Sequence, residues 1–453
     1  MRKIYLFTAV LYLTAEALYA QQPLRTWGSN QYGMLGQGSS TLLSTASPTQ
    51  VGTANWIAAD GGDFFSAGIQ SDGTLWAWGD QSEGKVGDGS TMGTATGMLS
   101  PLKISTDTTW TALSCGSSFT LAIKKDHSLW GWGDNDEHAM GIITPSDVYV
   151  PTQLGNNTTD WQSVNAGDAH VLAIKTNGTL WAWGDNDFGK LGIGTSASIA
   201  ATPTQVGTGT DWAMVAAGEE CSLGIKTDGT LWGWGQSTTG GSNTTSPVQI
   251  GTATDWKFVS SSNNSHFAIK NDGTLWAWGN NFVGQLGIGS SVSVTVPTQV
   301  GTDNNWISVR GGYMHTLALK ADHTLWAMGA SEALGMVSPL GENKPKQVGT
   351  ANNWTAIAAG SGHSLALGGQ SGTGIAEYLA EKKVTVYPNP TADFLNIDAK
   401  QPVENVSIAA INGQQLYSGT SMQINVRSFK PGIYYYRVTL KDQHIYAGSF
   451  VKQ

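Results

Sequence analysis

Acidic side chains recur in short turns of this chain, and a pair of carboxylates is what acid–base hydrolysis of a glycosidic bond requires. Asp63, Asp168 and Glu219 each follow a glycine, and Glu220 follows Glu219 directly. The spacing does not fix how far apart these groups lie in space. A hydrolase or lyase that acts on polysaccharide therefore stays an alternative, and no catalytic residue is predicted.

Three histidines, His170, His315 and His363, occupy corresponding places in repeated segments. A zinc triad would need them to converge from three separate units. Other segments carry unrelated residues at the same place, so we predict packing positions rather than metal ligands; these residues are Phe65, Phe119, Cys221 and Ser265.

Two aspartate-rich stretches, Asp134-Asn135-Asp136 and Asp185-Asn186-Asp187, resemble fragments of calcium-binding loops. The bidentate glutamate that completes such a loop is missing, so we expect Asx turns instead. The glycine-rich segments also lack the Lys-Ser/Thr pair and the helix of a phosphate-binding loop. We predict no metal and no cofactor.

The turns just before the histidine position differ most between segments, and we expect them to line one mouth of a central channel. Scaffold positions should repeat from unit to unit, whereas site positions should vary. Polar groups gathered from several units around a mouth form a ligand site. The candidate ligand-binding residues are Asp63, Phe64, Asp168, Glu219, Glu220, Asn263, Asn264, Tyr313 and Met314.

These turns must be positioned by a repeat of about 50 residues, which is visible as a Trp-x-Trp-Gly pattern. Its glycine recurs seven times, as Gly28, Gly79, Gly133, Gly184, Gly235, Gly279 and Gly329. A tryptophan opens another segment of each unit: Trp56, Trp110, Trp161, Trp212, Trp256, Trp306 and Trp354. A β-propeller with seven blades is the architecture that such repetition predicts.

Each unit reads as four short strands, because apolar runs of four to six residues alternate with Gly, Pro, Asn and Asp. Asp72-Gly73, Asn177-Gly178, Asp228-Gly229 and Asp272-Gly273 are typical of two-residue hairpins with positive φ angles. Asp126-His127 and Asp322-His323 depart from this pattern, so strain or a different turn is expected there.

The two ends of the repeat region complement each other. The first unit begins at Leu24, without the strand that should precede it, and the last stops at Leu367, without the strand that should follow. Pairing of the two ends would complete one blade and remove two exposed sheet edges. We therefore expect Trp27 and His363 in one shared blade.

The repeat resembles the regulator of chromosome condensation family, most closely at Gly184–Gly194 and Gly279–Gly289, across roughly residues 24–367. The resemblance implies a seven-bladed propeller. Two family activities do not carry over. Ultraviolet sensing uses a Gly-Trp-Arg-His-Thr motif, where this chain has Gly312-Tyr313-Met314-His315-Thr316. Nucleotide exchange on a nuclear GTPase takes place inside the cell, whereas the export signals described below predict a location outside it.

The N-terminus reads as an export signal over residues 1–20. Arg2 and Lys3 precede an apolar run from Ile4 to Thr14, and small residues lead to Ala20, with an alternative cleavage region at Ala15-Glu16-Ala17. The run is shorter than the ~20 residues that cross a bilayer, so no membrane span is expected. The two cysteines, Cys115 and Cys221, hold non-equivalent repeat positions and are predicted to be unbridged.

A second domain follows the propeller of residues 21–367 and a glycine-rich linker of residues 368–383. Residues 384–453 read as a small β-sandwich of short strands with a hairpin at Asn412-Gly413. Tyr387-Pro388-Asn389-Pro390, Gly432–Val438 and the terminal Phe450–Gln453 resemble, in order, the type A C-terminal sorting domain of the type IX secretion system. The resemblance implies that the secretion machinery recognises this tail and that the tail is usually removed after export.

The chain is therefore predicted to be all-β and secreted or held at the outer cell surface. Its net charge of −9 makes nucleic acid an unlikely ligand class. The leading hypothesis is a non-enzymatic binding protein whose ligand is a protein or a glycan. The alternatives are the polysaccharide hydrolase or lyase and a propeller that inhibits an enzyme.

Overall fold

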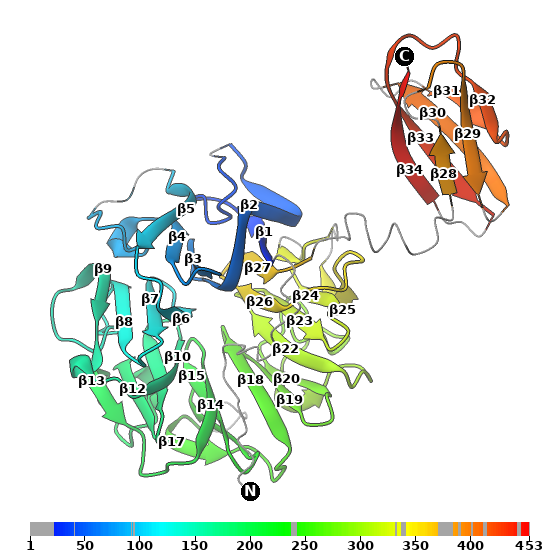
Figure 1. Cartoon of the computed structure of the whole chain (residues 1–453). Coiled ribbons are helices and arrows are strands. Elements are labelled where there is room, and N and C mark those ends of the chain that lie inside the picture. Colours follow the sequence, from blue (N-terminus) through cyan, green and yellow to red (C-terminus); the bar gives the residue numbers. More distant parts are fainter. Residues whose placement is uncertain are drawn as a thin grey trace, which may run out of the picture. The chain divides into compact units, whose positions relative to one another are not determined.

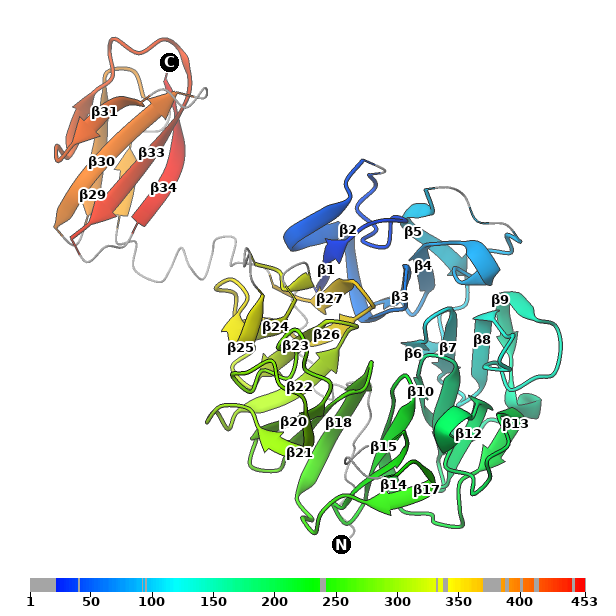
Figure 2. The same cartoon turned by 180° about the vertical axis from the view of Figure 1, so that it is seen from behind.

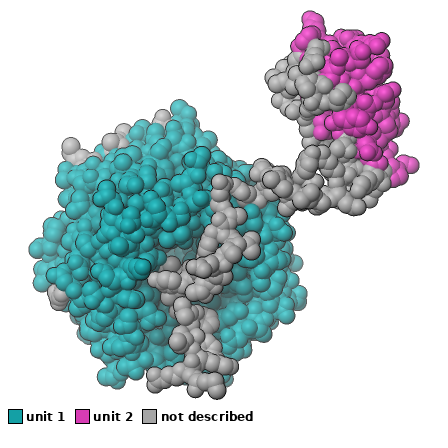
Figure 3. Space-filling model, viewed as in Figure 1, with its two compact units in different colours: residues 1–371 teal, residues 372–453 magenta. Residues whose placement is uncertain are grey.

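The computed structural model describes residues 22–39, 41–91, 93, 96–236, 242–330, 333–336, 341–369, 384–387, 391–399, 402–410, 415–441 and 445–452. The chain forms two compact units, residues 1–371 and 372–453, coloured separately in Figure 3. The predicted signal peptide, most of the predicted linker, Pro388-Asn389-Pro390 and the Asn412-Gly413 hairpin lie outside the described residues.

Four-stranded antiparallel sheets dominate the first unit and are arranged around a central axis, as Figures 1 and 2 show from opposite sides. Five sheets follow one another along the chain, each numbered from its inner to its outer strand. They are β6 (Trp110–Cys115), β7 (Phe119–Lys124), β8 (Leu129–Asp134), β9 (Asp147–Gln153); β10 (Trp161–Ala166), β11 (His170–Lys175), β12 (Leu180–Asp185), β13 (Ile199–Gln205); β14 (Trp212–Ala217), β15 (Cys221–Lys226), β16 (Leu231–Gly235), β17 (Thr244–Gln249); β18 (Trp256–Ser262), β19 (Ser265–Lys270), β20 (Leu275–Gly279), β21 (Val294–Gln299); and β22 (Trp306–Gly311), β23 (His315–Lys320), β24 (Leu325–Gly329), β25 (Glu342–Gln347).

A sixth sheet of the first unit has seven strands and joins the two ends of the repeat region. Its order is β26-β27-β1-β2-β3-β4-β5. The strands are β1 (Pro23–Ser29), β2 (Ser44–Gly61), β3 (Phe65–Gln70), β4 (Leu75–Gly79), β5 (Met98–Ser105), β26 (Ala356–Ala359) and β27 (His363–Leu367). Short 3-10 turns lie at Ser82–Gly84, Gly155–Asn157 and Asp187–Gly189.

Closure of the propeller comes from the pairing of β1 with β27. Trp27 stands opposite Ser364, and Gly28 stands opposite His363, so the expected shared blade is confirmed. The long strand β2 serves two blades, because its first part pairs with β1 and its second part pairs with β3. This arrangement is consistent with the predicted seven blades. It differs from the expectation of short strands only, because β2 is one continuous strand of 18 residues.

The hairpin between the second and third strand of each blade requires a positive φ angle. Gly178 has a φ of +79°, and a Cβ there would lie 2.2 Å from the carbonyl oxygen of Thr210. His127 and His323 adopt the same left-handed conformation, with φ of 64° and 61°. Each imidazole Nδ1 lies within 3.1 Å of a carbonyl oxygen in the next blade, which holds the strained residue in place.

The core of each blade is built around indole rings. Trp161 on β10 contacts Trp181 and Trp183 on β12, with ring centroids 6.3 and 5.7 Å apart. Trp183 is fully buried, and its Nε1 donates a 2.8 Å hydrogen bond to the carbonyl oxygen of Ala139 in the preceding blade. The repeated tryptophans therefore fill the blades and link each one to its neighbour.

The second unit is a small sandwich of two sheets around its own apolar core. One sheet has the order β28 (Val384–Tyr387), β29 (Phe394–Ala399), β32 (Gln423–Asn425). The other has the order β31 (Gln415–Gly419), β30 (Val403–Ala410), β33 (Gly432–Leu440), β34 (Ile445–Lys452). Leu395, Ile397, Val406, Ile408 and Phe450 are among the buried residues between them.

Two further predictions concern single features. Cys115 and Cys221 are free and buried, as expected. In the part of the chain that the structure describes, no helix has both the length and the apolar character needed to cross a membrane.

Candidate binding site in the central channel

The topology of a blade decides which loops meet at each end of the channel. Successive strands are antiparallel, so the turn after the first strand and the loop after the third strand lie at the same end. We call this the mouth end. The hairpins after the second strand lie at the opposite end, which we call the hairpin end.

A cavity of about 310 Å³ lies in the channel between the inner strands. Its wall includes residues of β2, β6, β10, β14, β18, β22 and β26 together with the turns that follow these strands. The cavity is therefore a property of the whole propeller rather than of one blade.

The structure divides the candidate residues into two groups. The first residue of each turn lines the cavity: Asp63, Asp168, Glu219, Asn263 and Tyr313. The second residue of each turn lies behind it, outside the cavity wall: Phe64, Glu220, Asn264 and Met314. Phe64, Tyr313 and Met314 are 37%, 49% and 47% exposed, which is high for apolar side chains.

A closed circle of hydrogen bonds joins the mouth turns of neighbouring blades. On one side, the backbone N–H groups of Asp63, Ser117 and Asp168 donate to carbonyl oxygens of Ser117, Asp168 and Gly218, at 3.0, 3.4 and 3.2 Å. The Nδ2 of Asn264 donates to Oε2 of Glu219 at 3.4 Å.

The circle is completed on the other side of the mouth. The Nδ2 of Asn263 donates to the carbonyl oxygen of Tyr313 at 3.0 Å. The backbone N–H of Tyr313 donates to Ser361, and that of Ser361 donates to Gly62, at 3.1 and 3.2 Å. These bonds hold the turns in fixed positions around the cavity.

The carboxylates at the mouth repel one another. Burial and the nearby Asp168 carboxylate raise the pKa of Asp63 to about 6, although Lys85 acts in the opposite direction. Burial, Asp168 and Glu220 raise the pKa of Glu219. Such shifts show that these three blades bring negative charge together at the mouth.

Glu220 has a different environment from the other acids. Its Oε2 lies 3.3 Å from the Nζ of Lys190, an ammonium group that also pairs with Asp185. Its charge is therefore balanced within the mouth-end loops, whereas Glu219 faces the cavity.

Two charged residues deeper in the channel were missing from the predicted set. Asp60 accepts hydrogen bonds at 3.0 Å from the backbone N–H groups of Gly61 and Cys115. Burial raises its pKa to about 6, and the positive charge of Arg310 opposes that shift. The Arg310 guanidinium lies over the ring of Phe258, with 5.0 Å between Cζ and the ring centroid.

A signal for these residues was present in the sequence. The position three residues before each mouth turn also varies between units; it is occupied by Asp60, Ser114, Asn165, Ala216, Ser260, Arg310 and Ala358. At three of these positions the polar side chain accepts a hydrogen bond from a backbone N–H group of the next blade. The distances are 3.0 Å for Asp60, 3.0 Å for Ser114 and 2.6 Å for Asn165. The channel wall thus varies between units in the same way as the mouth turns do.

The histidines lie between blades and not on the cavity wall. The Nε2 atoms of His170, His315 and His363 lie 2.9, 2.8 and 2.8 Å from serine hydroxyls of the next blade. Burial lowers the pKa of all three, to about 4 for His315 and about 3 for His363. Neutral imidazoles therefore link blades, in agreement with the packing interpretation.

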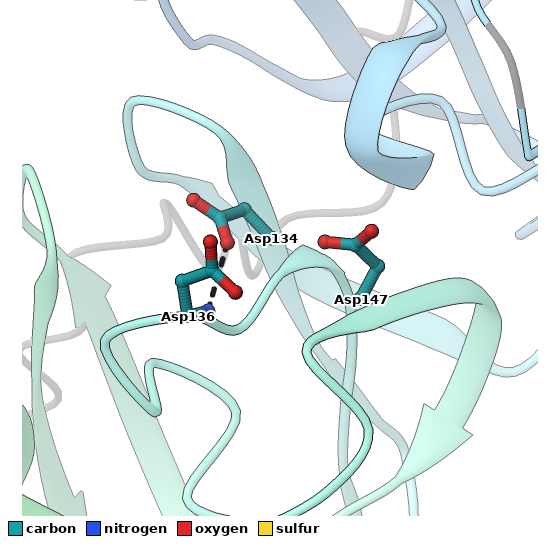
Figure 4. Close-up of side chains that lie close together, drawn as sticks. All are labelled: Asp134, Asp136 and Asp147. Atoms are coloured by element: carbon teal, nitrogen blue, oxygen red, sulfur yellow. Dashed lines mark hydrogen bonds between the residues drawn. The ribbon is translucent and has the colours of Figure 1, made fainter.

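One acidic cluster lies in an outer loop at the mouth end. Oxygen atoms of Asp134, Asp136 and Asp147 all lie within 4.8 Å of one another (Figure 4). Asp134 accepts a 2.8 Å hydrogen bond from the backbone N–H of Asp136, as in an Asx turn. In two other blades a lysine pairs with the equivalent aspartate, Lys85 with Asp80 and Lys190 with Asp185.

The cluster lacks that lysine because Ala139 occupies the corresponding position. Burial and the surrounding carboxylates raise the pKa of Asp134. Acidic groups on a surface often gather without an ion, so we assign no metal role to this cluster.

Comparison with known families gives three matches, two to the repeat and one to the tail. Two models are described as "Regulator of chromosome condensation (RCC1) repeat". One matches residues 72–123, 126–174, 177–225 and 272–319, and the other matches residues 110–138, 161–190 and 256–285. The family described as "Secretion system C-terminal sorting domain" matches residues 385–452.

Curated relatives share the repeat but not the whole chain. The human E3 ubiquitin-protein ligase HERC2 is 32% identical over 182 residues, which is 38% of this chain and 4% of that protein. The mitochondrial RCC1 domain-containing protein RUG3 of Arabidopsis thaliana is 30% identical over 241 residues, which is 50% of this chain and 52% of that protein. The chain thus spans at most about half the length of these relatives.

Solved structures show the same fold. Human WBSCR16 has a TM-score of 0.68 at 19% identity and covers 77% of this chain and 99% of its own. Prp20p of Saccharomyces cerevisiae has a TM-score of 0.70 at 17% identity and covers 80% of this chain and 94% of its own. At these identities the likeness concerns the fold alone.

Proposed function

This chain carries regulator of chromosome condensation repeats folded as a propeller, and a secretion system C-terminal sorting domain; from this premise we propose that it is an exported binding protein. The sorting domain points to the type IX secretion system, and hence to the outer cell surface or the medium. The ligand binds at the mouth end of the propeller and is a protein or a glycan.

One observation carries the binding proposal: the mouth turns differ in side chain from blade to blade, yet hydrogen bonds hold all of them rigidly around a 310 Å³ cavity. A rigid rim loses little conformational entropy when a ligand binds. Side chains that vary on a repeated scaffold supply specificity without a cost to the fold.

The test is binding of the purified full chain to protein and glycan arrays. We expect hits that weaken when Tyr313→Ala and Phe64→Ala remove exposed mouth side chains. A matched control, Val296→Ala, shortens a 58% exposed apolar side chain on the outer strand β21, away from the mouth turns. Hits that respond equally to all three variants, or to none, would count against a site at the mouth.

For export, we propose a signal peptide at residues 1–20, a propeller at 21–367, a linker at 368–383 and a sorting domain at 384–453. Deletion of residues 384–453 is expected to trap the protein in the periplasm, because the secretion machinery would have no tail to recognise. Cell fractionation measures this. Unchanged delivery to the surface would contradict the assignment.

A polysaccharide hydrolase remains the second candidate because of one observation. Burial raises the pKa of Asp63 to about 6 beside Asp168, and a general acid needs such a shift. Incubation with bacterial and plant polysaccharides, followed by reducing-end analysis, tests it. Turnover that is abolished by Asp63→Asn and by Asp168→Asn would replace the binding proposal with an enzyme.

A further inference from the structure

We propose that the mouth end binds a protein partner through a projecting lysine or arginine side chain that enters the channel between Asp63, Asp168 and Glu219. The inference rests on the proposed binding function and names the class of ligand.

The cavity is suited to a side chain rather than to an extended polymer. Its volume of about 310 Å³ is at the lower end of the range for small-ligand sites. Its wall is made of the inner strands of the propeller and the mouth turns that follow them. A loop that projects one long side chain would place that side chain in the cavity while the loop rests on the turns.

The rim has negative charge that no direct ion pair among the described residues neutralises, although Lys85 and Lys190 offset part of it. In the described part of the chain, no lysine, arginine or histidine forms an ion pair with Asp63, Asp168 or Glu219. The two nearest lysines already have partners: Lys85 pairs with Asp80 and Glu83, and Lys190 pairs with Asp185 and Glu220.

A cation from a partner would therefore relieve repulsion that exists in the free protein. An ammonium or guanidinium group donates several hydrogen bonds to carboxylate oxygens and is stabilised by their charge. Neutral sugar hydroxyls carry no charge that could balance three carboxylates lining one cavity. The charge of the rim thus favours a basic protein segment over a neutral glycan.

Exposed apolar side chains surround this acidic centre. Tyr32 contacts Phe64 edge to face, with ring centroids 5.4 Å apart, and both belong to mouth-end loops. Tyr313 and Met314 stand in another mouth turn, about half exposed. Farther out in the mouth-end loops, Phe188 and Phe282 are 44% and 80% exposed.

Aromatic and methionine side chains are the residues that protein interfaces use most at their centre. Combined with the acidic rim, they describe a surface that buries apolar contacts around one cationic anchor. Long-range attraction between the rim and a basic partner would also speed association.

The experiment selects ligands from a cyclic-peptide display library with the immobilised full chain. We expect the enriched peptides to share a lysine or arginine at a fixed position beside apolar residues. A synthetic copy of one selected peptide is then titrated against the wild-type chain and two variants by fluorescence anisotropy.

The first variant combines Asp63→Asn, Asp168→Asn and Glu219→Gln. The matched control combines Asp136→Asn, Glu137→Gln and Asp187→Asn, which removes the same charge from exposed outer loops at the same end. We expect about tenfold or greater loss of affinity for the first variant and about twofold or less for the control. Replacement of the basic residue of the peptide by glutamine should cost wild-type affinity but change little in the first variant.

The outcomes separate the two proposals. Peptides without a basic residue whose binding is lost in Phe64→Ala or Tyr313→Ala would overturn the cationic anchor and leave the mouth as the binding site. Peptides that bind equally well to every mouth variant would overturn both proposals. A library that yields no binder, together with a positive glycan array, would replace the protein partner by a glycan. Circular dichroism of each variant checks that it is folded.

Discussion

At the hairpin end of five blades, one lysine ammonium lies above two indole rings and beside an aspartate carboxylate, whereas the mouth turns of the same blades share almost no side chain. The lysines are Lys124, Lys175, Lys226, Lys270 and Lys320, and their Nζ atoms lie 3.6–5.2 Å from the ring centroids. From blade to blade, the side chains at the hairpin end are thus repeated, whereas the side chains at the mouth end change. The repeated contacts of the lysines are therefore found at the hairpin end, and the side chains that vary from blade to blade are found at the mouth, where we propose that the ligand binds.

A second repeated feature strengthens the hairpin end. In each hairpin, an aspartate or asparagine accepts a hydrogen bond from a Thr or Ser hydroxyl, and that hydroxyl accepts one from a tryptophan Nε1. Asp72, Thr74 and Trp76 show the pattern, with distances of 2.6 and 2.8 Å. These two hydrogen bonds connect the turn to a tryptophan on the third strand of the same blade.

The largest expected effect comes from removal of a hairpin-end indole. Trp161 is 1% exposed and packs against Trp181 and Trp183. Trp161→Ala should lower the free energy of unfolding by about 3–5 kcal/mol, because it leaves a large cavity. Tyr313→Ala at the mouth should change it by less than about 0.5 kcal/mol. Denaturant unfolding of both variants measures the contrast, and equal losses would remove the distinction between the ends.

A smaller effect is expected for the lysine between the indoles. Lys175 lies 4.7 and 4.6 Å from the rings of Trp161 and Trp181 and 3.1 Å from Asp160. Lys175→Met keeps the length of the side chain and removes its charge, so we expect a loss of about 1 kcal/mol. Gln70 occupies the same position in the blade of Trp56, and Gln70→Met serves as the control with little expected change.

A gain in stability is expected where a mouth-end loop lacks its lysine. Ala139→Lys would place an ammonium beside Asp134, as Lys85 lies beside Asp80. We expect an increase of about 0.5–1 kcal/mol in the free energy of unfolding, because the new pair balances a crowded carboxylate. The double variant Ala139→Lys with Asp134→Asn should lose the gain. Thermal unfolding decides this, and a loss for the single variant would show that the loop cannot hold the longer side chain.

A pH dependence of stability is expected at the rim. Burial and Asp168 raise the pKa of Asp63 to about 6, above the ~3.9 of an unfolded aspartate. The folded state therefore binds a proton more readily than the unfolded state, and this carboxyl disfavours folding increasingly as pH rises from about 4 to 6. Asp63→Asn should be slightly more stable than wild type at neutral pH, and the difference should shrink toward pH 4. A difference that grows on acidification would contradict the burial of this carboxyl.

Much of the fold could be predicted because the repeated residues act locally. A Gly such as Gly178 is needed for its own hairpin, and a Trp such as Trp76 bonds to the hairpin of its own blade, so their recurrence predicts the blades directly. The pairing of Leu24 with Leu367 followed from strands missing at the two ends. The continuity of β2 could not be predicted. It arises because the connection between an outer strand and the next inner strand stays extended within Ser44–Gly61, whereas the corresponding connections between the other blades do not.

The candidate site was predicted only in part, since it depends on contacts between blades. The varied turns were visible in the sequence. The circle of hydrogen bonds through Asn263, Tyr313 and Ser361 was not, because it joins backbone groups whose spacing the propeller sets. Asp60 and Arg310 were overlooked because they belong to strands, although their position varies as much as the turns do.

The most direct test of the account is hydrogen–deuterium exchange of the full chain with and without a selected peptide. We predict added protection in the mouth turns around Asp63, Asp168, Glu219 and Tyr313, and none in the hairpins at Gly73, Gly178 and Gly229. Protection that appears in the hairpins while the mouth turns stay unchanged would contradict the claim that the varied end is the binding surface.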